Sequence, residues 1–135
     1  MDFYSYEAIK LKLEQDKREV ELELSELTQK RDNLLIRKSK ETEKLTHTTK
    51  VLQERGAVTA AYLKQRYNFD ILRQCDRDIE LVEKYIAETK VEIERIKEQE
   101  LYVENLYQEK IKEKERAERK KEEEMLFEMK KWTDF

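Results

Sequence analysis

The chain has 135 residues, of which 45% are charged and only 38% are hydrophobic, so it has too little apolar side chain to bury a broad globular core. It contains one glycine and no proline, which argues against β-sandwiches, α/β folds and glycine-rich phosphate loops, because these need many turns. Its 29 basic and 32 acidic residues leave a net charge of -3, so no strong positive field exists and no nucleic-acid partner is expected.

The sequence shows no sign of a membrane span, a signal peptide or a disulfide. No apolar run approaches the roughly 20 residues that span a bilayer. The first residues, "MDFYSYEAIKLKLEQDKREV", contain acidic side chains where a signal peptide would be apolar. The single Cys75 cannot form an internal disulfide. We therefore expect a cytoplasmic protein with no direct membrane insertion.

A first long helix is predicted over residues about 4–54, because apolar side chains recur there every seven positions. One row of this heptad pattern holds Tyr6, Leu13, Val20, Leu27 and Leu34. The companion row is mostly cationic and holds Lys10, Lys17, Leu24, Arg31, Lys38, Leu45 and Leu52. Long basic side chains can lie along a partner helix while their charged ends stay in water, so the apolar face is expected to be narrow.

A turn is predicted at about residues 55–58, within "ERGAVTAAYL", which contains the only glycine of the chain. Glycine adopts the left-handed conformation just past a helix end at little cost, so Gly56 is expected to end the first helix. The hydroxyl of Thr59 is expected to cap the start of the second helix.

A second helix is predicted over residues about 59–130, where the heptad pattern is stronger. One row holds Leu72, Ile79, Ile86 and Ile93, and the other holds Cys75, Val82, Thr89, Ile96 and Val103. If the chain folds back at the turn, the apolar positions meet in pairs, namely Leu52 near Tyr62, Leu45 near Phe69, Leu27 near Ile86, Val20 near Ile93 and Tyr6 near Tyr107. The predicted fold is all-α: a long antiparallel two-helix coiled-coil hairpin that forms a single elongated domain over residues 1–135.

The end of the second helix is predicted to be a charged overhang beyond its partner. Residues 108–124, "QEKIKEKERAERKKEEE", hold seven basic and seven acidic side chains, which is typical of a solvated helix. The following "MLFEMKKWTDF" is rich in methionine and aromatic side chains, and the amino terminus "MDFYSY" is similar. Such apolar ends indicate a partner surface. The alternative is that the second helix bends back and the two ends cover each other.

No catalytic chemistry is expected. His47 stands alone between threonines and Cys75 occupies a seam position, so neither suggests a metal site or a nucleophile. A thin hairpin also offers no concave pocket for a triad of catalytic residues. We therefore expect a protein that is not an enzyme and that needs no cofactor and no metal.

The stretch "RGAVTAAYLKQRYNFDILRQCDRDI", residues 55–79, resembles the FliJ and YscO family, the central-stalk proteins of the flagellar and virulence type III export ATPases. In that family a glycine-containing turn precedes a helix with an aromatic residue, further aromatics, then a leucine and an isoleucine. The matching positions here are Gly56, Tyr62, Tyr67, Phe69, Leu72 and Ile79. The ending "EMLFEMKKWTDF" is also similar to the endings of several members.

This resemblance implies a coupling role. The paired terminal portions would insert into the centre of a hexameric export ATPase, and the first part of the second helix would contact the export gate in the inner membrane. The implied ATPase-binding candidates are Phe3, Tyr4, Lys10, Lys17, Met125, Phe127 and Trp132, and the implied gate-binding candidates are Tyr62, Tyr67 and Phe69. The implied location is the cytoplasm, peripheral to the secretion apparatus, and secretion chaperones are further candidate partners.

Two other readings remain open from the sequence. A prefoldin-type chaperone also uses antiparallel helical hairpins, but residues 54–63 are too short to supply the β-hairpins through which such chaperones assemble. A parallel tethering coiled coil would need its heptads to run in phase through Gly56, and the Tyr6 row and the Leu72 row do not share a register. For the stalk reading we expect the chain alone to be a monomer, and the choice between a flagellar and a virulence system stays open.

Overall fold

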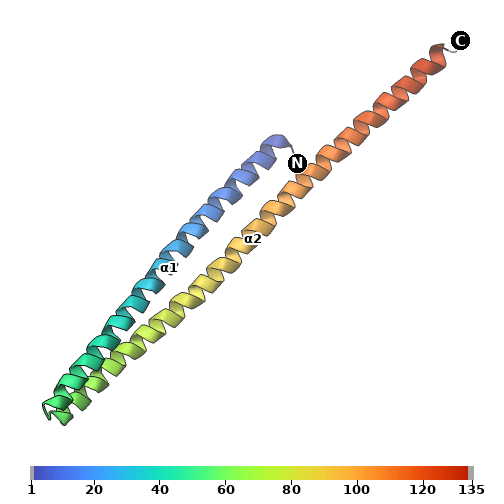
Figure 1. Ribbon diagram of the computed structural model, residues 1–135. Coiled ribbons are helices and arrows are strands. Elements are labelled where there is room, and N and C mark those ends of the chain that lie inside the picture. The colour runs from blue at the N-terminus through green and yellow to red at the C-terminus, as the bar shows by residue number, and fades with distance from the viewer. Residues whose placement is uncertain (1, 134–135) are drawn as a thin grey trace. The chain divides into compact units, whose positions relative to one another are not determined.

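The computed structural model describes residues 2–133, and within them the chain forms two long helices joined by a short turn (Figure 1). Helix α1 covers Phe3–Glu54 and helix α2 covers Val58–Thr133. The two helices pack against each other, and the described residues contain no strand. Contacts pair increasing positions of α1 with decreasing positions of α2, for example Tyr6 with Tyr107 and Lys17 with Glu100. The predicted all-α antiparallel hairpin is therefore confirmed.

The chain divides into two compact units that share both helices. The first, which we call the terminal unit, comprises Met1–Lys17 and Glu94–Phe135, and the second, the turn unit, comprises Arg18–Ile93. Each unit is described below by itself.

The turn is a helix end built on Gly56, which has a φ of +73°. The N–H of Gly56 donates to the carbonyl of Gln53 at 3.0 Å, and the N–H of Ala57 donates to the carbonyl of Leu52 at 2.9 Å. These two bonds form the Schellman arrangement that satisfies carbonyls at the end of a helix. The expectation for Gly56 is met, and a continuous helix through this position, which a parallel coiled coil would need, is not formed.

The start of α2 differs from the prediction at Thr59. The helix begins one residue earlier, at Val58, and the carbonyl of Ala57 accepts the N–H of Ala61 at 2.9 Å. Thr59 is therefore a residue of the first helical turn and not its cap. The physical reason is the Schellman turn itself, because it places Ala57 directly at the helix entry and leaves no room for a longer connection.

The core of the turn unit is a single seam of α2 side chains. Two rows repeat every seven residues and contain its buried residues, Ala61, Asn68, Cys75, Val82 and Thr89 in one row and Ile79, Ile86 and Ile93 in the other. The hydroxyl of Thr89 donates to the carbonyl of Tyr85 at 2.7 Å, so this buried polar group is paired. Both rows that the sequence predicted are confirmed, and the row through Cys75 extends back toward the turn through Asn68 and Ala61.

Helix α1 contributes half-buried side chains to the turn unit. Val20, Leu24, Leu27 and Leu34 lie on its inner face, as the predicted rows require. Farther toward the turn, Lys38 Nζ lies 2.5 Å from Asp76 Oδ1 and forms an ion pair between the two helices. Because both side chains are about half exposed, this ion pair contributes little to the stability of the hairpin. Burial of apolar side chains between the two helices contributes more.

Candidate functional site

The terminal unit holds an aromatic cluster, which we call the aromatic clasp and which consists of Phe3, Tyr4, Tyr6 and Tyr107. The rings of Tyr6 and Tyr107 stack in parallel with their centroids 4.0 Å apart, and Tyr6 is only 6% exposed. Phe3 lies 6.5 Å from Tyr107 and 5.9 Å from Tyr4, measured between ring centroids. Stacked and edge-on aromatic pairs of this kind add stability beyond the area that they bury. The clasp therefore ties the first turn of α1 to α2.

Polar contacts reinforce the clasp. The hydroxyl of Tyr6 donates to Oε2 of Glu104, and the ammonium group of Lys10 lies 5.9 Å from the centre of the Tyr6 ring. Asp2 begins α1 by accepting the N–H of Ser5 at 2.6 Å. This bond stabilises the carboxylate and lowers the pKa of Asp2 below its ordinary value of 3.8. The first residues are thus ordered by a cap and a clasp together.

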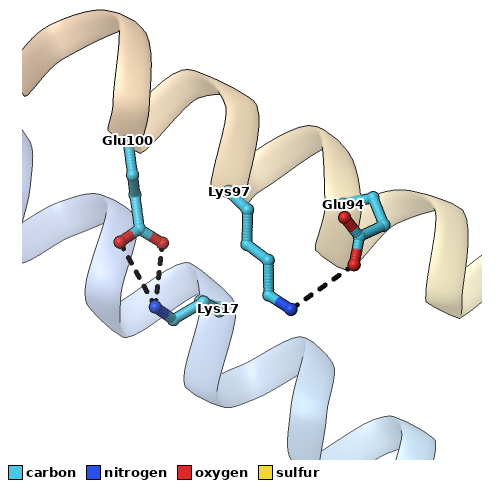
Figure 2. A network of polar contacts seen from close by, with 4 residues as sticks. All are labelled: Lys17, Glu94, Lys97 and Glu100. Atoms are coloured by element: carbon cyan, nitrogen blue, oxygen red, sulfur yellow. Dashed lines mark hydrogen bonds and ion pairs between the residues drawn. The ribbon is translucent and has the colours of Figure 1, made fainter. Parts of the chain in front are cut away.

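Next to the clasp, Figure 2 shows a pair of cross-helix contacts at Glu100 and a contact along α2. Lys17 Nζ donates to Oε2 of Glu100 at 3.2 Å and lies 3.0 Å from Oε1, with each side chain 26% exposed. Lys97 pairs with Glu94 at 3.4 Å on the same helix and is more exposed. Lys17, one of the ATPase-binding candidates, thus pairs with Glu100 across the two helices and keeps part of its side chain exposed.

The remaining terminal candidates are exposed on the surface. Tyr4 is 83% exposed and Phe3 is 55% exposed, although both belong to the clasp. Along α2, every described residue after Ile111 is exposed, including Met125, Phe127 and Trp132. Phe127 lies in a shallow depression with Lys120, Glu123, Glu124 and Glu128. Phe135, the last aromatic of this stretch, lies outside the described residues.

The predicted alternative, in which the second helix bends back so that the two ends cover each other, is not what the terminal unit shows. Helix α2 continues without interruption to Thr133, and the apolar residues from Met125 onward remain exposed. No glycine or proline lies in this stretch to break the helix. The apolar end of α2 is therefore an unpartnered surface in the isolated chain.

The turn unit carries the second candidate surface, which we call the turn groove. It is a depression lined by Tyr62, Gln65, Arg66, Phe69, Asp70 and Arg73. Tyr62, Arg66, Phe69 and Arg73 follow one another at helical spacing and form a stripe along α2, in which aromatic and arginine side chains alternate. Tyr62 is 63% exposed and Phe69 is 48% exposed.

The position of these aromatics differs from the pairing that the sequence suggested. Tyr62 and Phe69 were expected near Leu52 and Leu45, whereas the buried seam positions are the preceding residues, Ala61 and Asn68. The cause is the heptad phase, because the row through Cys75 and Val82 reaches Asn68 and Ala61 in steps of seven. The small Ala61 and the polar Asn68 concealed this continuation in the sequence.

Tyr67, the third gate candidate, lies outside the groove. It is exposed, and the ammonium group of Lys64 lies 5.7 Å from its ring centre, as in a surface cation–π pair. Arg66 and Arg73 were not predicted, although the alternation of aromatic and arginine side chains at i, i+4, i+7 and i+11 is visible in the sequence. Within the described part of the chain, neither arginine forms a hydrogen bond or an ion pair.

The single cysteine, the single histidine and the acidic residues are the side chains that could hold a metal ion. Residues 2–133 contain no group of three histidine, cysteine, aspartate or glutamate side chains that could hold a metal ion. Cys75 is buried in the seam, and His47 is exposed on α1. Over the same residues, no helix combines the length and the apolar character needed to cross a bilayer.

Comparison with known proteins gives no relative: no family model, no curated protein and no solved structure matches this chain. The resemblance to the FliJ and YscO family therefore rests on residues 55–79, on the ending "EMLFEMKKWTDF" and on the hairpin architecture.

Proposed function

We propose that this protein is a non-catalytic central stalk of a type III export ATPase, which couples the ATPase to the export gate. The observation that carries the proposal is the terminal unit. There the aromatic clasp holds the start of α1 on α2, and exposed apolar residues continue along α2 to Trp132. Aromatic and methionine side chains are enriched at protein interfaces, so this unit has the composition of a docking surface.

The hexameric ATPase is the proposed partner of the terminal unit. A central stalk must enter a ring as a thin element, and a two-helix hairpin that continues as a single helix is suited to this. Phe3, Tyr4, Met125, Phe127 and Trp132 are the proposed contact residues because their side chains are exposed. Lys10 and the partly exposed Lys17, which pairs with Glu100, can add charge complementarity.

The turn unit is proposed to meet the export gate. Tyr62, Tyr67 and Phe69 expose large apolar areas close to the turn, well apart in sequence from the proposed ATPase contacts. Secretion chaperones are further candidate partners of the same protein. In this proposal the chain acts in the cytoplasm at the inner-membrane secretion apparatus and needs no cofactor, since it transmits contact and performs no reaction.

The experiment compares two variants for binding to the purified ATPase hexamer by biolayer interferometry. The terminal variant combines Phe3→Ala and Tyr4→Ala with deletion of residues 125–135, and the turn variant combines Tyr62→Ala with Phe69→Ala. We expect the terminal variant to bind at least about tenfold more weakly, since several exposed anchors are lost, and the turn variant to bind like the wild type. Unchanged ATPase binding by the terminal variant would show that the terminal assignment is wrong.

Binding to the export gate is tested with the same two variants. The turn variant is expected to lose binding to the cytoplasmic domain of the gate, while the terminal variant keeps it. Circular dichroism serves as the control for folding: the substituted side chains are exposed, so the turn variant should keep the helicity of the wild type and the terminal variant should lose only the helical residues that the deletion removes.

A further inference from the structure

We propose that the turn groove binds the acidic apolar segment near the end of α2 from a second copy of this chain. This segment, which we call the acidic tail, is residues 122–129, "EEEMLFEM". The inference concerns self-association and stands independently of the proposed function.

The groove presents two unpaired positive charges beside aromatic rings. Arg66 and Arg73 lie on the two sides of Phe69 along the stripe, and Tyr62 closes the groove toward the turn. Arginine binds carboxylates with two parallel hydrogen bonds and also stacks on aromatic rings. A groove with this composition therefore favours a ligand that combines carboxylates with an apolar side chain.

The acidic tail has this composition. It contains four glutamates and no basic residue, in a chain whose charges are otherwise nearly balanced. Phe127 is 71% exposed and shares its depression with Glu123, Glu124 and Glu128. An aromatic side chain flanked by carboxylates is thus presented on a formed helix, so little conformational entropy is lost on docking.

The minority charges of the two surfaces are complementary as well. The groove includes one carboxylate, Asp70, and the depression around Phe127 includes one ammonium group, Lys120. Docking of Phe127 between Tyr62 and Phe69 would let the glutamates reach Arg66 and Arg73. Like charges placed opposite each other would be penalised, so this sign pattern selects the tail.

The occupant has to come from another molecule. The groove and the acidic tail belong to the same helix, α2, which contains neither glycine nor proline. Folding the tail back onto its own groove would break helical hydrogen bonds, and this costs more than a small surface contact returns. A single helix face buries less area than a permanent interface, so the association is expected to be weak and the dilute protein to be a monomer.

The test uses full-length chains and measures the weight-average mass by sedimentation equilibrium at increasing protein concentration. The groove variant is R66E/R73E, the tail variant is E123K/E124K/E128K, and the swapped variant carries all five substitutions. A matched control, K64E/R77E, changes the net charge as the groove variant does but at positions outside the groove. Circular dichroism verifies that every variant remains helical.

The wild type and the control are expected to associate with rising concentration, and more weakly at high salt. The groove variant and the tail variant are each expected to lose at least about tenfold in the association constant, and the swapped variant to recover it, because its charges are again complementary. A wild-type chain that stays monomeric at all concentrations overturns the proposal. So does association that is equal in the groove variant and the control, or a swapped variant that fails to recover. None of these outcomes depends on an ATPase.

Discussion

Asp2, Tyr6 and Tyr107 show how single side chains order the start of α1. Asp2 supplies the missing acceptor for the N–H of Ser5, and the Tyr6 ring stacks on Tyr107 and lies 5.9 Å from the ammonium group of Lys10. The end of a helix usually frays, because its first N–H groups lack partners. Here the cap and the clasp oppose fraying where the proposed ATPase contact requires an ordered surface.

The Asp2 cap makes the first turn of α1 sensitive to acid. Its pKa is lowered by the hydrogen bond from Ser5, so the stabilising contribution is complete above the ordinary pKa of 3.8 and is lost as the pH falls through the lowered folded-state pKa. NMR chemical shifts of Ser5 and Tyr6, followed from roughly pH 6 to pH 2, should show this loss of helicity. Asp2→Asn is the control, since it can cap without titrating. An acid transition that persists unchanged in Asp2→Asn would contradict the assignment.

The stack of Tyr6 on Tyr107 predicts energetic coupling between the two rings. In a double-mutant cycle of Tyr6→Ala and Tyr107→Ala, followed by urea unfolding, we expect a coupling free energy of about 0.5–1.5 kcal/mol. The pair Leu101→Ala and Tyr107→Ala is the control, because the Leu101 side chain is 62% exposed and lies outside the clasp. Additive effects of the two tyrosine substitutions would show that the rings do not stabilise each other.

At the scale of the elements, the turn and the seam determine the hairpin. Gly56 ends α1 with a φ of +73°, and no heavy atom lies within 4 Å of a Cβ placed there. Any cost of a side chain at this position is therefore backbone strain and not a steric clash. The stability of the seam, by contrast, depends on side-chain packing. Its α2 rows are deeply buried, whereas the facing side chains of α1 are only half-buried.

Substitution of Gly56 measures the backbone strain at the turn. Gly56→Ala is expected to lower the free energy of unfolding by about 1–2 kcal/mol, because an L-residue in the left-handed region is strained. Gly56→Asn should cost less, since asparagine tolerates this conformation. Thermal unfolding followed by circular dichroism measures both. Equal stability of Gly56→Ala and the wild type would mean that the left-handed turn is not populated.

The seam predicts a contrast between two aliphatic residues on α2. Ile86 is 5% exposed and Val91 is 70% exposed. Ile86→Ala should lower the free energy of unfolding by about 2–3 kcal/mol, since a two-helix seam can partly collapse around the cavity, whereas Val91→Ala should change it by less than about 0.5 kcal/mol. Chemical denaturation of both variants checks this, and similar losses at the two sites would contradict the assigned helix face.

The sequence predicts much of this architecture because heptad spacing and one glycine carry most of the information. The rows through Leu13 and Ile86 and the turn at Gly56 are all visible as patterns. The predicted pairing of residues near the turn was wrong because two adjacent residues could each have faced the partner helix. Tyr62 has a larger side chain than Ala61, yet Ala61 is buried and Tyr62 is exposed. The heptad phase, and not the size of the side chain, decides which residue faces the partner helix.

The candidate sites were less predictable for the same reason. The heptad pattern places Lys17 in the row that faces the second helix, but it does not show that Glu100 is its partner there. Arg66 and Arg73 could be recognised as candidate binding residues only once the structure placed them in the same groove as Phe69. Pairing across two helices depends on register to within one residue, and a pattern of apolar residues does not determine this for charged side chains.

For the whole molecule, the two surfaces divide the proposed work. The terminal unit is proposed to bind the ATPase and the turn unit to bind the gate, so one chain could respond to one partner while touching the other. The self-docking of the acidic tail on the turn groove would occupy parts of both surfaces in unassembled copies. Assembly with the ATPase would then compete with self-association.

Native mass spectrometry of the complex between this protein and the purified export ATPase gives the number of chains bound to each hexamer. A stalk that enters the centre of the ring leaves room for a single copy, so we predict one chain per ATPase hexamer, with complex formation reduced by the terminal variant. A complex with one chain on each ATPase subunit, or no complex at all, would contradict the account.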